Sequence, residues 1–126
     1  MDEEVAERKR DYIEERVPNT KAPVLIMVFG RAGEPYWVQS VWLAIGYMLL
    51  ALEEKGLASL TYTPSKVYWA NKLLGVPEEY VLQAVIPVGK ARGIPKTKER
   101  LSLDGIAYCN KWEQNYAVCL DLDRDA

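Results

Sequence analysis

The chain has 126 residues, of which 49% are hydrophobic, and its 16 Lys and Arg against 18 Asp and Glu give a net charge of −2. This length and composition predict one folded domain with a core that needs neither metal nor disulfide, and they argue against disorder. The weak acidity argues against nucleic acid as a partner. The chain has no histidine, which excludes Ser-His-Asp hydrolysis and His-ligated zinc.

The first elements are a charged helix and an apolar strand. A narrow apolar stripe predicts a helix over residues 3–17, ended by Pro18-Asn19. The apolar run Val24 to Phe29, followed by Gly30, is typical of a buried strand. The segment Met1 to Arg16 lacks the apolar centre of a signal peptide, so we expect a cytoplasmic protein.

A long apolar segment, residues 35–52, follows this strand. Glutamates flank it without an excess of positive charge on one side, which favours a buried helix over a membrane span. Its apolar residues surround the helix from Val41 to Leu52, and such a helix needs cover on every side. In so short a chain a second copy can supply that cover, so we predict a homodimer formed through the helix around Val38 to Lys55, with Gly56 ending the helix.

The second half of the chain continues the alternation of strands and helices. It predicts a strand over residues 58–63, a helix over 65–74 closed by Gly75, and a strand over 81–88. A basic loop over residues 90–100 comes next, and a final helix is expected from Ser102 or Leu103 towards Trp112. The fold class is therefore mixed α/β, a sheet packed on helices.

Two segments have the composition of a binding site. The loop contains five cations, which suits the phosphate of a small molecule, although a solvated surface loop is the alternative. These cations are Lys90, Arg92, Lys96, Lys98 and Arg100. Hydroxyl groups gather at residues 61–63, the carboxyl end of a predicted strand, where ligands of α/β sheets tend to bind.

The remaining polar candidates have simpler interpretations. Cys109 and Cys119 are ten residues apart without a C-x-x-C pair, so we expect two reduced structural thiols and no metal site. Asp121, Asp123 and Asp125 have the spacing that begins a calcium loop, but the rest of that motif is missing. They are interpreted as an acidic tail.

Several segments in order resemble the nitroreductase family of FMN flavoproteins. The matching segments are PYWVQSVWLAI (35–45), LLALEEKGLASLTYTP (49–64), LLGVP (73–77), IPVG (86–89) and KER before LD (98–104). The Gly-Leu pair followed by Thr-x-Thr-Pro is most similar to the branch that contains iodotyrosine deiodinase. The resemblance extends from about Ala22 to Trp112.

The resemblance implies a cofactor, a site and an assembly. It implies FMN, with Thr61 and Tyr62 along the flavin ring and the Thr63 hydroxyl bonded to flavin N5. Arg100, and after it Lys98, would bind the FMN phosphate. The flavin would carry hydride from NAD(P)H to a small organic acceptor, so no catalytic acid, base or metal is expected. The family's long helix forms the centre of an intertwined homodimer.

The chain departs from the family on its amino-terminal side. The family's Arg-rich segment, which supplies further phosphate ligands, has no match before Ala22. We therefore expect a charged helix over 1–21, an FMN-binding half domain over 22–112 that is truncated at its amino-terminal side, and a tail over 113–126. Another polypeptide could complete the site. The alternative function is a non-catalytic relative that dimerises or binds a partner.

Overall fold

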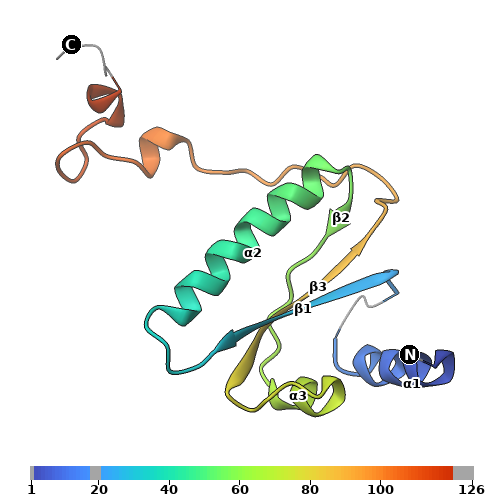
Figure 1. The fold of residues 1–126 in the computed structure, drawn as a ribbon. Coiled ribbons are helices and arrows are strands. Elements are labelled where there is room, and N and C mark those ends of the chain that lie inside the picture. The colour runs from blue at the N-terminus through green and yellow to red at the C-terminus, as the bar shows by residue number, and fades with distance from the viewer. Residues whose placement is uncertain (1, 18–20, 121–126) are drawn as a thin grey trace. The chain divides into compact units, whose positions relative to one another are not determined.

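The computed structural model describes residues 2–17 and 21–120, which form two compact units, Met1–Arg92 and Gly93–Ala126. Within these described residues, the first unit contains three helices and three strands, and the second contains two short 3-10 helices (Figure 1). The elements of the first unit are α1 (Glu3–Glu14), β1 (Val24–Arg31), α2 (Trp37–Glu54), β2 (Ala58–Ser59), α3 (Tyr68–Leu74) and β3 (Tyr80–Gly89). Those of the second unit are η1 (Leu103–Gly105) and η2 (Tyr116–Cys119).

The sheet is antiparallel and has the order β1-β3-β2, so β3 is its central strand. The pairing of β1 with β3 runs from Val24 opposite Val88 to Arg31 opposite Tyr80. The register shifts once, between Val28 and Phe29, and this bulge leaves Gln83 without a partner residue on β1. Trp42 on α2 donates its indole N–H to the Gln83 side chain at 3.2 Å, so the bulge is tied to the long helix.

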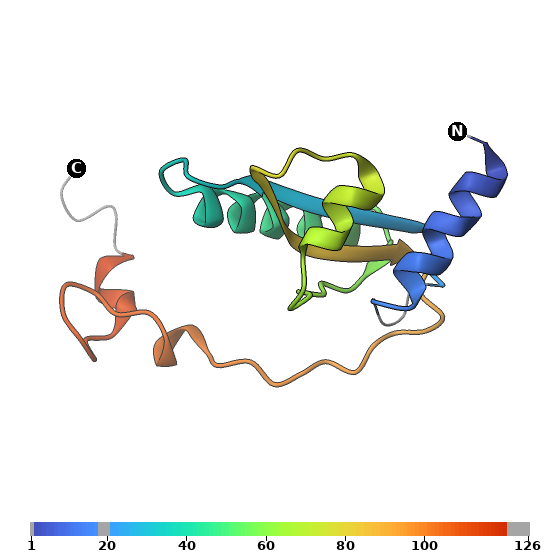
Figure 2. The same cartoon turned by 90° about the horizontal axis from the view of Figure 1, so that it is seen from below.

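Helices lie on both faces of the sheet (Figure 2), and each face carries its own apolar core. On one face, Ile45 of α2 packs with alternate residues of β3, namely Ala84, Ile86 and Val88. On the other face, side chains from α1, the turn after it, α3 and β3 form the second core, which comprises Ile13, Val17, Ala70, Leu82 and Val85. The unit is thus three layers, helix, sheet and helices. β3 alternates between the two cores from Ala84 to Ile86, and the bulge at Gln83 shifts this alternation, so that Leu82 shares a core with Val85.

The end of α2 is a Schellman motif. Gly56 has a φ of 70°, its N–H donates to the Glu53 carbonyl, and the N–H of Leu57 donates to the Leu52 carbonyl. Leu52 and Leu57 both pack against the α2 core, which completes the motif with an apolar contact. The prediction that Gly56 ends this helix is confirmed.

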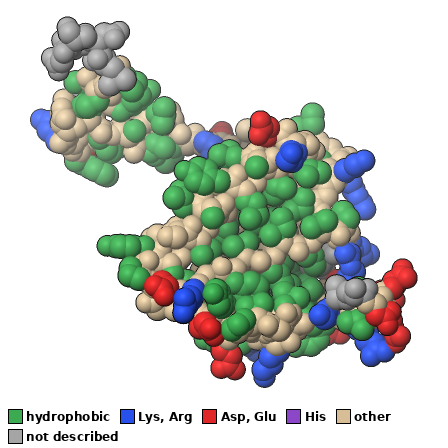
Figure 3. Space-filling view, in the orientation of Figure 1, with side chains coloured by type: hydrophobic (Ala, Val, Ile, Leu, Met, Phe, Trp, Pro, Cys, Tyr) green, Lys and Arg blue, Asp and Glu red, His purple; other side chains and the backbone are tan. Residues whose placement is uncertain are grey.

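The outer face of α2 remains apolar and exposed. Leu43, Tyr47 and Leu50 recur at intervals of four and three residues, and 61–69% of each side chain is accessible. Figure 3 shows hydrophobic side chains gathered across the same face of the molecule. The first unit by itself therefore covers only one side of a helix that is apolar on all sides.

Two predicted elements differ from the structure. The strand expected over 58–63 is regular only at Ala58–Ser59, although Tyr62 still forms an isolated bridge with Val85. The final helix expected up to Trp112 is wrong, since only the short η1 forms there. Positive φ values at Asn110 and Glu113 turn the chain back on itself, which a continuous helix does not allow.

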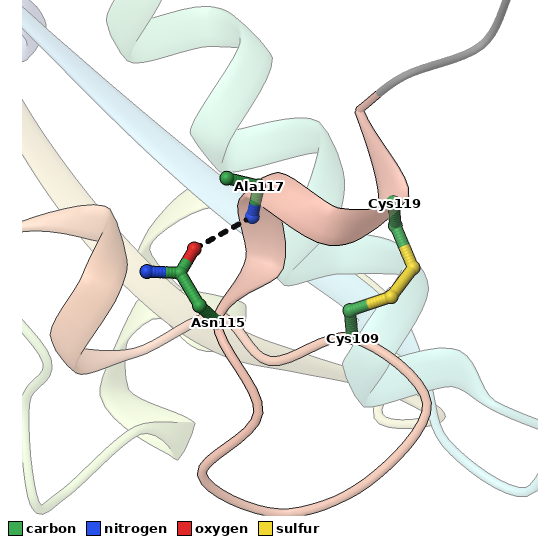
Figure 4. Close-up of a disulfide and its surroundings, with 4 residues drawn as sticks. All are labelled: Cys109, Asn115, Ala117 and Cys119. Carbon is green, nitrogen blue, oxygen red and sulfur yellow. Dashed lines mark hydrogen bonds between the residues drawn. A yellow bond between two sulfur atoms is a disulfide. The ribbon is translucent and has the colours of Figure 1, made fainter. Parts of the chain in front are cut away.

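The prediction of two reduced thiols is also wrong. Cys109 and Cys119 form a disulfide with a Cα–Cα separation of 5.8 Å (Figure 4). An isolated bridge pairs Tyr108, just before the first cysteine, with Asn115 inside the closed loop. The Asn115 side chain accepts from the N–H of Ala117 at 2.8 Å and begins η2. The turn brings the two sulfur atoms together, and ten residues of sequence spacing could not reveal it.

Among the helices in the described part of the chain, none combines the length and the apolar content needed to cross a membrane. The predicted helix stop at Pro18-Asn19 and the predicted tail at Asp121, Asp123 and Asp125 lie outside the described residues.

Candidate functional site

The hydroxyl-bearing segment lies along the central strand. The N–H of Tyr62 donates to the Val85 carbonyl at 3.0 Å, and the N–H of Val85 returns a bond of 2.9 Å to the Tyr62 carbonyl. The Tyr62 side chain packs against the core shared by α1 and α3. These bonds fix residues 61–63 against the most buried strand of the molecule, so their side chains have a rigid support.

Within this segment the two threonines have different environments. The Thr61 hydroxyl oxygen is buried and has no hydrogen-bond partner among the described residues. The Thr63 side chain is exposed. A buried hydroxyl without a partner costs free energy, and such groups are rare in folded proteins, so Thr61 has an unused hydrogen-bonding site.

The predicted phosphate ligands lie in a different part of the molecule. Residues 90–100 contain no regular secondary structure, and all of them are exposed to solvent. Lys98 and Arg100 belong to the second unit, whereas residues 61–63 belong to the first. The structure thus brings Thr61, Tyr62 and Thr63 together, and the joint site with Lys98 and Arg100 stays a prediction.

The expectation that residues 61–63 lie at a ligand-binding strand end is not supported by the topology of the sheet. The rule that ligands bind at the carboxyl ends of strands applies to parallel sheets, but this sheet is antiparallel. The location of residues 61–63 therefore follows from their pairing with β3 instead. In the described part of the chain, no group of three acidic, Cys or His side chains is arranged to hold a metal ion.

Sequence reasoning missed one cation, Lys21. It lies with Lys90 and Arg92 around an open hollow of the first unit. The antiparallel pairing of Val24 with Val88 brings the start of β1 beside the end of β3. Lys21 precedes β1, and Lys90 and Arg92 follow β3, so this pairing places the three cations around the same hollow. The only signal in the sequence was the position of Lys21 just before an apolar strand.

Residues 6–90 match the model of the Nitroreductase family. The match covers more than half of the chain, and the chain belongs to this family. It includes residues 61–63 and both cores of the first unit. The mixed α/β fold predicted from the sequence is confirmed by similarity to solved structures of the family.

Two curated relatives are iodotyrosine deiodinases. The protein of Thermotoga neapolitana is 45% identical over 93 residues, which cover 69% of this chain and 50% of that protein. The protein of Haliscomenobacter hydrossis is 38% identical over 78 residues, which cover 54% of this chain and 35% of that protein. The chain thus spans half or less of the length of these relatives.

Solved structures show the same relationship. An oxidized iodotyrosine deiodinase bound to FMN and 3-iodo-L-tyrosine is 36% identical with a TM-score of 0.59, over 79% of this chain and 64% of that chain. An FMN-dependent nitroreductase of Clostridium difficile R20291 has a TM-score of 0.61 at 20% identity, over 72% of this chain and 59% of that chain. The second likeness concerns the fold alone.

Proposed function

We propose that the chain forms part of an FMN-dependent oxidoreductase of nitroreductase type. The observation that carries the proposal is the family match over residues 6–90, because it includes the segment on which the Thr61 hydroxyl is buried without a partner. A polar group of a bound flavin would satisfy that hydroxyl, so the residues present fit the cofactor.

The residues of this chain would bind and orient the cofactor. Thr61 and Tyr62 would lie along the flavin ring, and the Thr63 hydroxyl would donate to flavin N5. Arg100 and Lys98 would hold the phosphate, Arg100 through two parallel N–H groups and Lys98 as a point charge. When bound, FMN supplies hydride chemistry between NAD(P)H and a small organic acceptor.

The relatives support a proposal for the class of acceptor. The identity of 45% to a deiodinase favours a halogenated phenol over a nitro compound as the substrate. In such a reaction two electrons and one proton replace a carbon–iodine bond by a carbon–hydrogen bond and release iodide.

The exposed face of α2 supports a homodimer as the functional form. Leu43, Tyr47 and Leu50 form one apolar stripe on α2, the longest helix among the described residues. A second copy would cover this stripe and exclude it from water. A further polypeptide could supply additional phosphate ligands. The second candidate function is a dimerisation module without flavin, which the same stripe favours.

The first experiment is an absorbance spectrum of the purified chain between about 350 and 500 nm, where oxidised flavin absorbs, followed by titration with FMN. We expect a flavin band or quenching of FMN fluorescence on binding. A dimer that shows neither would contradict the proposal and support the module.

The phosphate assignment is tested by Arg100→Ala. We expect FMN affinity to fall by about 10-fold or more, since a charge-assisted pair is lost, while riboflavin affinity stays unchanged. Lys96→Ala is the matched control, because it removes a cation from the same basic segment without an assigned role. Equal FMN affinity in Arg100→Ala and Lys96→Ala would remove Arg100 from the site.

A further inference from the structure

The hollow around Lys21, Lys90 and Arg92 combines a cationic rim with an apolar floor. The three cations line it together with a single carboxylate, that of Glu14. The floor includes Val17 and Pro87, which are buried, and Leu60, which is 51% exposed. All of these residues belong to the first unit.

Backbone pairing holds the rim in place. Val24 opposite Val88 and Ala58 opposite Gly89 bring the beginnings of β1 and β2 to the end of β3. Arg10 donates to the carbonyls of Ala22 and Pro23 at 3.1 and 3.2 Å, which anchors the segment after Lys21 to α1. A Cβ on Gly89 would lie 3.0 Å from Pro23, so these two walls are already in close contact.

The charge at this place contrasts with the rest of the chain. The protein as a whole is acidic, with a net charge of −2, yet three cations and one carboxylate surround this hollow. Like charges held close together repel, and a bound anion relieves the repulsion. In the described part of the chain, neither lysine nor Arg92 forms an ion pair with a carboxylate.

We propose that this hollow is a binding site for a small phosphate monoester with an apolar body. The phosphate carries up to two negative charges, which suits three cations better than a carboxylate does, and Arg92 can donate two parallel N–H groups to it. The apolar body lies over Leu60 and Pro87. The proposed ligand is a molecule other than FMN, and the inference does not depend on FMN binding.

The test is a titration of the full chain with phenyl phosphate, followed by amide chemical shifts. We expect the amides of Lys21, Leu60 and Gly89 to move. Binding should weaken about 10-fold or more in Lys90→Ala/Arg92→Ala, because two charge-assisted contacts are lost. Lys55→Ala/Lys72→Ala removes two exposed cations elsewhere and should leave the affinity within about two-fold.

Further variants and probes distinguish the contribution of the charged rim to binding from that of the apolar floor. Glu14→Gln removes the one carboxylate and should tighten phenyl phosphate binding by about two-fold or more. Leu60→Ser should weaken phenyl phosphate but leave inorganic phosphate unchanged. Benzoate should bind more weakly than phenyl phosphate.

Three results would overturn the proposal. The first is equal binding by Lys90→Ala/Arg92→Ala and by the Lys55→Ala/Lys72→Ala control. The second is equal affinity for inorganic phosphate, benzoate and phenyl phosphate. The third is displacement of phenyl phosphate by FMN but not by riboflavin, which would assign the hollow to the cofactor phosphate. Absence of FMN binding would contradict the proposed function and leave this site intact.

Discussion

At the scale of single residues, Thr61 is the most informative position. Its hydroxyl is buried without a partner, so Thr61→Val, which keeps the shape, should raise the free energy of unfolding of the flavin-free chain by about 1–3 kcal/mol. The same variant should bind FMN more weakly, because it lacks the hydroxyl. Urea unfolding and FMN titration measure the two effects. A variant that is less stable without flavin would show that the hydroxyl has a partner within the chain.

At the scale of elements, the substitution of glycine by alanine should have opposite effects on stability at two positions, one inside α2 and one at its end. Gly46 lies inside α2, where an added Cβ meets no atom within 4 Å, so Gly46→Ala should stabilise the chain by about 0.5–1 kcal/mol. Gly56 has a φ of 70° at the helix end, so Gly56→Ala should destabilise it by roughly 1 kcal/mol. Thermal unfolding compares them. A loss of stability at Gly46→Ala would place a neighbouring surface against that side of α2.

Removal of the disulfide should destabilise the second unit only locally. It closes a loop between residues ten apart, and its removal in Cys109→Ser/Cys119→Ser should cost that loop about 2–3 kcal/mol. The amide of Cys109, which donates to the Gln114 carbonyl, should then exchange faster with solvent. The amides of β3 serve as the internal control, and faster exchange there would contradict a local role.

At the scale of the whole molecule, the exposed stripe of α2 predicts a dimer. Leu43→Lys/Leu50→Lys should raise the dimer dissociation constant by about 100-fold or more, because it buries two unpaired charges in the interface. Light scattering over a range of concentrations measures the mass. Tyr68→Lys is the control, because this exposed residue lies on α3, at the other face of the sheet. A monomeric unsubstituted chain would contradict the prediction.

The sequence by itself determined the elements whose signals are local. The apolar runs placed β1 and β3, and the left-handed positions of Gly56 and Gly75 ended α2 and α3 as predicted. Local chain geometry sets these features within a few residues. The five matching segments between residues 35 and 104 together also indicated the family, since they depend on residue types alone.

Only the tertiary structure decided the features that join distant residues. The antiparallel order of the strands, the shortness of β2, the Cys109–Cys119 pairing and the meeting of Lys21 with Lys90 and Arg92 all depend on register and on chain reversal. Sequence spacing does not encode these contacts, because they form between segments brought together by burial of the two cores. For the same reason, the burial of the Thr61 hydroxyl became visible only when its segment was paired with β3.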